Sequence, residues 1–182
     1  MAEPFSYSVW LVPAHPVREA LARVIGELAQ RFETRAFTPH ATLCSGEWNA
    51  NLNDLKRKLE ALSATLRTVK LTTHGLGCGD ERTTFFYIRL ENEPVEPLFA
   101  QAVAALPGSH APKIGAHLSL MYAEPNAGID REALATEIAD RIPARIDFDE
   151  VQLVTPAHSK ARPDRWQTQH TARLTGSRPE AK

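Results

Sequence analysis

Two short segments of the chain share the form His-x-(Thr/Ser)-Leu: Pro39-His40-Ala41-Thr42-Leu43 and Ala116-His117-Leu118-Ser119-Leu120. Each is a short, largely apolar run of the kind that forms a β-strand. Because side chains alternate across a strand, His40 and Thr42 share one face, and His117 and Ser119 share one face of the second strand. Each strand therefore presents an imidazole beside a hydroxyl, with apolar residues behind them. Two such strands facing each other would place two imidazoles and two hydroxyls around a single cleft.

The rest of the chain is predicted to form short strands and amphipathic helices, because 13 prolines and 9 glycines interrupt it. The predicted strands are rich in β-branched and aromatic residues and span 6–12, 38–44, 68–76, 83–90, 117–122, 145–155 and 166–174. Helices are predicted where apolar residues recur every three or four positions, within 16–32, 51–62, 95–103 and 130–138. Asn51 and Asp130 are expected to cap the second and fourth helices, and Pro16 to open the first.

The order of these elements repeats in outline. It runs strand, helix, strand, helix and two strands, and then helix, strand, helix and two strands, with one His-x-(Thr/Ser) strand in each half. We therefore predict the α+β class, in which bilobal, pseudo-duplicated antiparallel sheets with outer helices enclose a central cleft. Residues 1–176 would form this single bilobal domain, and residues 177–182 a flexible tail.

The composition is that of an ordinary globular protein, with 182 residues of which 43% are hydrophobic and 24% charged. No apolar run reaches the length of a membrane span, about 18 residues, and residues 1–10 lack the features of a secretory signal. Cys44 and Cys78 are too few for a disulfide framework and fit a reducing cytosol. We therefore expect a cytoplasmic monomer without a membrane partner.

The net charge of −1 argues against a protein whose main function is to bind long nucleic acid, because such proteins use many Lys and Arg side chains against the phosphates.

The paired motif suits phosphoryl chemistry that needs no metal ion. Imidazole titrates near neutral pH, so one histidine can be neutral and accept a proton while the other is charged and donates one. The hydroxyls of Thr42 and Ser119 can donate hydrogen bonds to phosphate oxygens. No carboxylate or thiol lies inside either motif, and the nearest are Cys44 and Glu124, so we expect no metal site.

The chain resembles the two-histidine (2H) phosphoesterase superfamily, and within it the cyclic phosphodiesterase branch known from plants and yeast. The segments that carry the resemblance include the two motifs in their context: Tyr7–Pro13, Phe37–Leu43, Phe85-Phe86, His117–Glu124 and Trp166. By matching position, the implied catalytic tetrad is His40, Thr42, His117 and Ser119. The resemblance also implies a water-filled cleft, no cofactor, and a substrate groove lined by Trp10 and Tyr122. The plant members carry more cysteines, so redox regulation is not carried over.

The resemblance implies hydrolysis of small cyclic phosphodiesters to phosphomonoesters, with nucleoside 2′,3′-cyclic phosphates or ADP-ribose 1″,2″-cyclic phosphate as substrates. In the expected reaction His117 deprotonates water and His40 protonates the departing sugar oxygen. Three alternatives stay open. They are an RNA 2′,5′ ligase or a phosphodiesterase acting on RNA 2′,3′-cyclic phosphate ends, a non-catalytic nucleotide- or RNA-binding module, and a metal-dependent hydrolase. The roles of five further residues also stay open: Phe85, Phe86, Lys160, Arg162 and Trp166.

Overall fold

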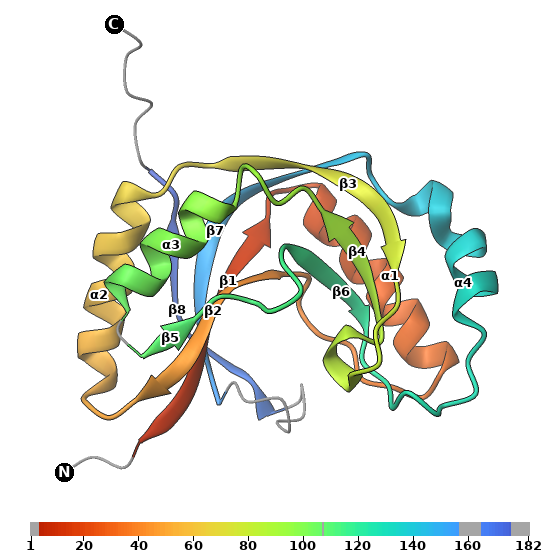
Figure 1. Ribbon diagram of the computed structural model, residues 1–182, viewed down its shortest axis with the longest axis horizontal. Coiled ribbons are helices and arrows are strands. Elements are labelled where there is room, and N and C mark those ends of the chain that lie inside the picture. Colours follow the sequence, from red (N-terminus) through yellow and green to blue (C-terminus); the bar gives the residue numbers. More distant parts are fainter. Residues whose placement is uncertain (1–3, 107, 157–164, 176–182) are drawn as a thin grey trace, which may run out of the picture.

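The strands of the computed structural model form one eight-stranded sheet in which neighbouring strands run antiparallel. The structure describes residues 4–106, 108–156 and 165–175. Its strands are β1 (Phe5–Pro13), β2 (Ala41–Trp48), β3 (Val69–Gly77), β4 (Phe86–Leu90), β5 (Ser109–His110), β6 (His117–Met121), β7 (Arg145–Thr155) and β8 (Gln167–Arg173). They lie in the order β1-β2-β6-β4-β3-β7-β8, with β5 beside β2. Because β1 also pairs with β7, the sheet closes on itself (Figure 1).

The long strand β7 is shared by two lobes. Its first residues pair with β3, and its later residues lie between β1 and β8. One lobe is therefore β8-β7-β1-β2-β5, and the other contains β3, β4 and β6. The lobes meet again where Ala41 of β2 pairs with Leu118 of β6. Each of these two residues is the middle residue of a His-x-(Thr/Ser) segment, so this junction brings the two motifs together.

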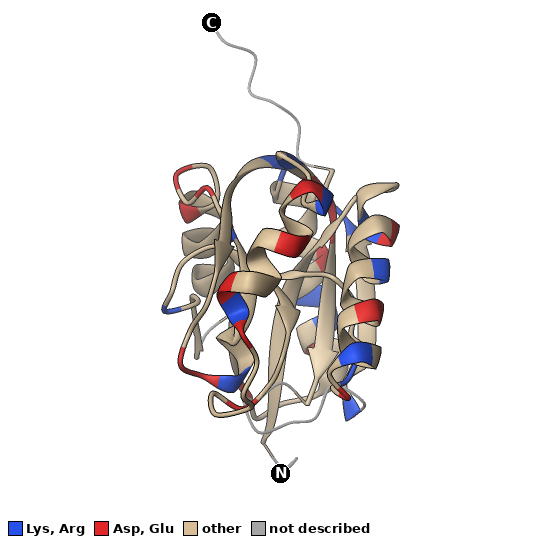
Figure 2. Cartoon of the chain, turned by 90° about the vertical axis from the view of Figure 1, so that its right-hand side faces the viewer, with Lys and Arg blue, Asp and Glu red and all other residues tan. Residues whose placement is uncertain are grey.

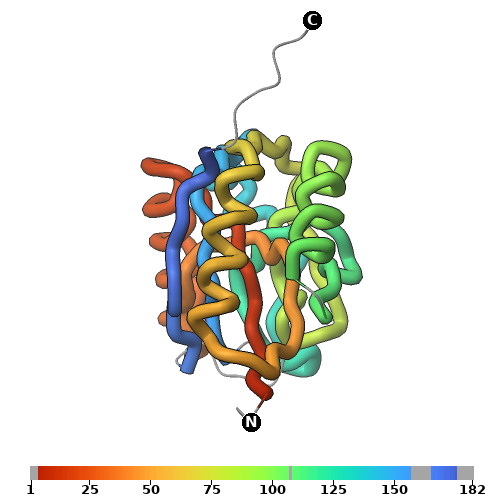
Figure 3. The backbone as a smooth tube through the Cα atoms, turned by 90° about the vertical axis from the view of Figure 1, so that its left-hand side faces the viewer, coloured from red at the N-terminus to blue at the C-terminus, as the bar shows by residue number. Residues whose placement is uncertain are grey.

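Four helices flank the sheet: α1 (Val17–Arg31), α2 (Leu52–Thr65), α3 (Glu96–Ala105) and α4 (Arg131–Ile138). Helices α2 and α3 lie side by side on the first lobe, and α1 and α4 lie on the second (Figures 1 and 3). Helix α1 packs on β6 and α3 packs on β2, so each contacts a strand from the other half of the chain. An ion pair of 2.7 Å between Arg31 and Glu137 ties α1 to α4. The predicted bilobal, pseudo-duplicated α+β architecture is confirmed, and its halves exchange elements.

The helices begin where the sequence predicts. Asn51 Oδ1 accepts the backbone N–H of Asn53 at 2.8 Å, and Asp130 Oδ1 accepts that of Ala133 at 3.0 Å. Each N-cap of this kind contributes about 1 kcal/mol. Pro16 directly precedes α1. The buried face of α1 consists of Leu21, Val24, Ile25, Leu28 and Ala29.

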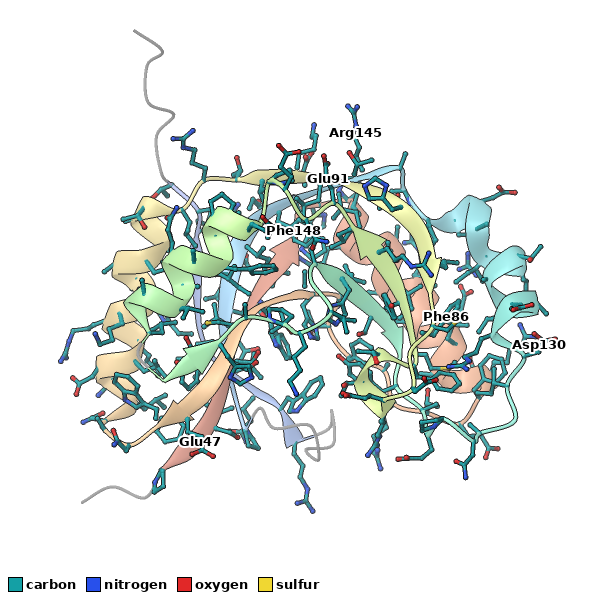
Figure 4. All side chains as sticks on the ribbon, in the orientation of Figure 1. Glu47, Phe86, Glu91, Asp130, Arg145 and Phe148 are labelled. Atoms are coloured by element: carbon teal, nitrogen blue, oxygen red, sulfur yellow. The ribbon has the colours of Figure 1, made fainter. Side chains whose placement is uncertain are left out.

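The hydrophobic core lies between the sheet and the helices, and strand β1 shows how the sequence separates core from cleft. Its core face carries Tyr7, Val9 and Leu11. On the opposite face, Ser8 and Trp10 line a cleft. Phe86 on β4 and Phe148 on β7 are also fully buried and lie among the interior side chains (Figure 4). Alternation along the strands therefore gives the sheet one apolar face and one face that holds the site.

The structure corrects several predicted boundaries. Strand β2 begins at Ala41 rather than at residue 38. The strand predicted at 83–90 begins later, because Arg82–Thr84 form a 3-10 turn before β4. Strand β5 has no counterpart in the prediction, since a strand of two residues is too short to show alternation. The predicted tail at 177–182 lies outside the described residues.

Figure 2 shows Lys and Arg interspersed with Asp and Glu on the face that carries α4, which fits the net charge of −1.

Both cysteines are free, with Cys44 buried and Cys78 exposed. In the part of the chain that the structure describes, no helix has the length and apolar character needed to cross a bilayer.

Candidate active site

A cleft of about 690 Å³ lies at the junction of the two lobes. Its lining contains all six site residues predicted from the sequence: Trp10, His40, Thr42, His117, Ser119 and Tyr122. Small-molecule sites in proteins span roughly 300–1,000 Å³, so the volume suits a ligand of nucleotide size.

The pairing of Ala41 with Leu118 sets the relative position of the two motifs. Because β2 and β6 run antiparallel, His40 lies toward Ser119, and Thr42 lies toward His117. Ala41 and Leu118 are both buried in the core. Their neighbours on either side therefore point the other way, into the cleft. Each imidazole thus lies next to the hydroxyl of the opposite motif.

The two imidazoles are anchored in the same way. His40 Nδ1 lies 2.6 Å from the carbonyl oxygen of Thr38, and His117 Nδ1 lies 2.9 Å from the carbonyl oxygen of Gly115. A carbonyl oxygen only accepts, so Nδ1 carries the proton and donates in both rings. In the neutral state Nε2 of each ring is then an unprotonated nitrogen, ready to accept a proton.

Burial favours the neutral form of both imidazoles. It lowers the pKa of His40 from 6.5 to about 4, the hydrogen bond to Thr38 opposes this effect, and the charge of His117 adds to it. Burial also lowers the pKa of His117, against the opposing effect of its bond to Gly115. An anion bound between the rings would favour their charged forms and raise both pKa values.

The two hydroxyls differ in their hydrogen bonds. Ser119 Oγ donates to the carbonyl oxygen of Thr83 at 2.8 Å, so its proton is engaged. Thr42 lines the cleft and is half-buried, and its hydroxyl bonds to no residue that the structure describes. Thr42 is therefore the hydroxyl whose proton is available to a ligand without breaking another bond.

Aromatic rings surround His40. Trp10 stacks on it with ring centroids 3.6 Å apart and planes 11° from parallel. Trp166 contacts His40 edge-on at 6.1 Å and Trp10 edge-on at 5.3 Å. Phe37 adds a further edge contact with His40 at 6.0 Å. One face of Trp10 therefore supports the imidazole, and the residue as a whole is 5% exposed.

Tyr122 lies deeper in the wall than Trp166. Its ring stacks on Phe37 with centroids 4.2 Å apart, and Trp166 meets it edge-on at 5.7 Å. Burial raises the pKa of Tyr122 well above its ordinary value, and a hydrogen bond with Ser119 opposes this effect. The phenol therefore stays neutral and closes one side of the site.

The residues whose roles the sequence left open separate clearly. Trp166 lines the cleft. Phe85 and Phe86 are buried, and neither belongs to the cleft lining. The guanidinium of Arg131 lies 5.0 Å from the ring of Phe85, which is therefore a packing residue. Lys160 and Arg162 lie outside the described residues.

Sequence reasoning missed the polar residues at one end of the cleft: Ser6, Ser8, Ser45, Glu47, His110 and Lys113. Alternation with Trp10 along β1 was a usable signal for Ser6 and Ser8. A register shift beside Val9 and Trp10 adds one residue to β2, which lets Ser45 reach the same cleft as Thr42. Strict alternation would have placed Ser45 on the other face, so no sequence signal pointed to it.

Comparisons with known proteins agree with this architecture. Residues 5–106 match the cyclic phosphodiesterase-like protein family. A comparison with curated proteins finds no match. The crystal structure of E. coli LigT complexed with phosphate has a TM-score of 0.58 at 16% identity, over 96% of this chain and 99% of that one. The structure of Kluyveromyces marxianus Usb1 with uridine monophosphate has a TM-score of 0.52 at 13% identity, over 93% and 97%.

The two kinds of match complement each other. The family match contains the first motif, with His40 and Thr42, and ends before the second. The structural matches extend over nearly the whole chain and show the shared fold. Since the family match spans more than half of the 182 residues, the chain belongs to the cyclic phosphodiesterase-like family, within the 2H phosphoesterase superfamily that acts on phosphodiesters.

Proposed function

We propose that this protein hydrolyses small cyclic phosphodiesters to phosphomonoesters without a metal ion, with nucleoside 2′,3′-cyclic phosphates or ADP-ribose 1″,2″-cyclic phosphate as substrates. The matched anchoring of the two imidazoles carries the proposal. His40 and His117 each bind, through Nδ1, the carbonyl oxygen two residues earlier. Nε2 of each ring is thereby left for proton transfer. Two such nitrogens in one cleft supply both a general base and a general acid.

In the proposed reaction a water oxygen attacks phosphorus, and the bond from phosphorus to one sugar oxygen breaks. The neutral imidazole takes a proton from the water, while the charged imidazole gives its proton to the departing sugar oxygen. The product is a phosphomonoester beside a free sugar hydroxyl, and the two rings have exchanged protonation states. Each proton transfer contributes roughly 10²–10⁴ in rate.

Burial favours one assignment of the two roles. His40 is 4% exposed and its pKa is lowered to about 4, whereas His117 is only half-buried. When a phosphate anion raises the pKa of both rings, the less buried ring is the easier one to protonate. We therefore propose that His117 protonates the sugar oxygen and His40 deprotonates water, which reverses the roles expected from the sequence.

The charges of the cleft support a small substrate. Its described lining carries the ammonium of Lys113 against the carboxylates of Glu47 and Glu81. A protein that tracks a long RNA uses many cationic side chains against the phosphates, and this lining does not supply them. A single phosphate can instead be held by the free hydroxyl of Thr42 and by the charged imidazole.

The test is a panel of nucleoside 2′,3′-cyclic phosphates and ADP-ribose 1″,2″-cyclic phosphate, incubated in EDTA, with the products identified by phosphorus NMR. We expect ring opening, and we expect His40→Ala and His117→Ala to abolish most of it. His74→Ala is the matched control, because His74 is exposed on β3 and outside the cleft lining. Near wild-type activity in either cleft variant would overturn the assignment.

The alternatives give other outcomes of the same assay. Ligation or trimming of short RNA ends, with no opening of the small cyclic phosphates, would identify an RNA-end enzyme. Activity lost in EDTA and restored by a divalent cation would identify a metal-dependent hydrolase, although no three His, Cys, Asp or Glu among the described residues are placed to hold a metal ion. Nucleotide binding without turnover would identify a binding module.

A further inference from the structure

One peptide unit connects Asn92 to the imidazole of His117. The N–H of Ala116 donates to Asn92 Oδ1 at 2.7 Å, and the carbonyl of Gly115, at the other end of the same peptide bond, accepts from His117 Nδ1 at 2.9 Å. The carbonyl of Ala116 accepts in turn from the N–H of Leu90 at 3.1 Å. The segment that leads into the second motif is therefore held by both a backbone and a side-chain bond from the chain around β4. Hydrogen bonds in such a series polarise and strengthen one another.

In the first motif, the peptide that binds the imidazole of His40 needs no side chain to hold it in place. His40 Nδ1 binds the carbonyl of Thr38 at 2.6 Å, and the next residue is Pro39. A proline nitrogen carries no hydrogen, and its ring fixes φ, so the Thr38–Pro39 peptide has no N–H to satisfy. The corresponding peptide before His117 has an N–H, which must find an acceptor when it is shielded from water. Asn92 provides that acceptor in the second motif.

The surroundings of Asn92 hold its side chain against this peptide. Its own carbonyl accepts the N–H groups of Val95 and Glu96, both at 2.9 Å, at the start of α3. Gly115 has a φ of +75°, and a Cβ there would lie 2.5 Å from Asn92 Oδ1. Glycine is thus required at this position by its backbone conformation and by the close approach of Asn92.

We infer that Asn92 is a positioning residue for His117, which acts by holding the Gly115–Ala116 peptide in the orientation that binds Nδ1 and leaves Nε2 free. Its effect on turnover rests on the proposed function, but its effect on the imidazole does not. Without this acceptor, the carbonyl of Gly115 is free to turn away. The ring then loses the bond that favours both the Nδ1–H tautomer and the charged form of His117.

The experiment follows the imidazole nitrogens by ¹⁵N NMR during a pH titration of the ligand-free full chain. We expect Asn92→Ala to lower the pKa of His117 and to mix the Nε2–H tautomer with the Nδ1–H tautomer, while His40 keeps its tautomer. Asn92→Asp retains an oxygen acceptor and should restore the Nδ1–H tautomer. Among the described residues, the titratable groups His40, Tyr87 and Arg89 lie near His117, and Glu81, His110, Lys113 and Tyr122 line the same cleft; all variants keep them.

Asn51→Ala is the matched control, because Asn51 also accepts a backbone N–H through Oδ1 but does so at α2, away from the cleft. It should leave His117 unchanged. Asn92→Ser, with a side chain too short to replace the bond, serves as a second variant should Asn92→Ala not fold. With an active wild type, kcat should fall on the order of tenfold to a hundredfold at an unchanged KM, as expected for a misplaced catalytic group.

Two results separate this inference from the proposed function. A folded Asn92→Ala or Asn92→Ser protein with the wild-type tautomer and pKa of His117 would overturn the positioning role, whatever its activity. A wild-type protein that opens none of the cyclic phosphates would overturn the proposed function, and the shift of the tautomer in Asn92→Ala would still establish the positioning role.

Discussion

Trp10 and His40 lie face to face, with ring centroids 3.6 Å apart and planes 11° from parallel. The resemblance implies that Trp10 lines the substrate groove. In the structure the indole face covers the imidazole that the proposed mechanism uses. The stacking helps to keep water from His40, and burial is the main reason why the pKa of that ring is low.

Removal of the indole should therefore make His40 easier to protonate. We expect Trp10→Ala to raise the pKa of His40 from about 4 toward 6.5, because water reaches the ring. Trp10→Phe keeps an aromatic face and should give an intermediate value. Histidine NMR titration measures the change. Trp48→Phe, outside the cleft lining, serves as control, and an unchanged pKa in Trp10→Ala would show that the stack does not exclude water.

The buried neutral His40 should also destabilise the protein in acid. Its pKa is 6.5 when unfolded and about 4 when folded, so the unfolded chain binds the proton more readily. Stability is thus complete above about pH 6.5 and falls as the pH drops toward 4, by about 3 kcal/mol in total. Urea unfolding of wild type and His40→Gln between these pH values tests this. Between pH 6.5 and 4, His40→Gln should lose about 3 kcal/mol less unfolding free energy than the wild type. His74→Gln should lose as much as the wild type.

The assignment of acid and base can be tested with a leaving group that needs no proton. On a nucleotide p-nitrophenyl phosphodiester, the variant that lacks the general acid should recover most of its turnover, because nitrophenolate departs unprotonated. We expect recovery in His117→Ala and none in His40→Ala. The opposite pattern would restore the roles expected from the sequence, and equal loss in both variants would show that neither ring acts as the acid on this substrate.

The two motif hydroxyls should contribute unequally, because Ser119 already donates to Thr83, whereas Thr42 bonds to no residue that the structure describes. We expect Thr42→Val to lower kcat/KM by about 10- to 100-fold, the value of a hydrogen bond to a charged group. Ser119→Ala should cost less activity but more stability, because it leaves the carbonyl of Thr83 without this donor. Thr42→Ser should retain most of the activity. Equal losses for Thr42→Val and Ser119→Ala would contradict the difference.

Local features of the site could be predicted from the sequence. The alternation of His40 with Thr42, the caps at Asn51 and Asp130, and the buried face of α1 depend on residues that are close in the chain. Each of these signals extends over a few residues, so a single sequence contains it completely.

The pairings and contacts that join distant residues could not be predicted, although the family resemblance implied that the two motifs meet in one cleft. The pairing of Ala41 with Leu118 and the stack of Trp10 on His40 depend on sheet register, which side-chain patterns do not determine for strands this far apart. The extra residue in β2 shifts its later side chains to the other face without a glycine or proline to mark it. The bond from Asn92 to Ala116 likewise follows from how β4 and β6 pair.

The exchange of elements between the halves has a consequence for biosynthesis. Strand β1 lies between β2 and β7, and β7 comes from the last third of the chain. The first lobe is therefore incomplete until β7 and β8 have been synthesised, and α1 has no β6 to cover until residues 117–121 have been made. A nascent chain that ends before β6 lacks His117, so it cannot yet contain the pair of histidines around which the cleft is built.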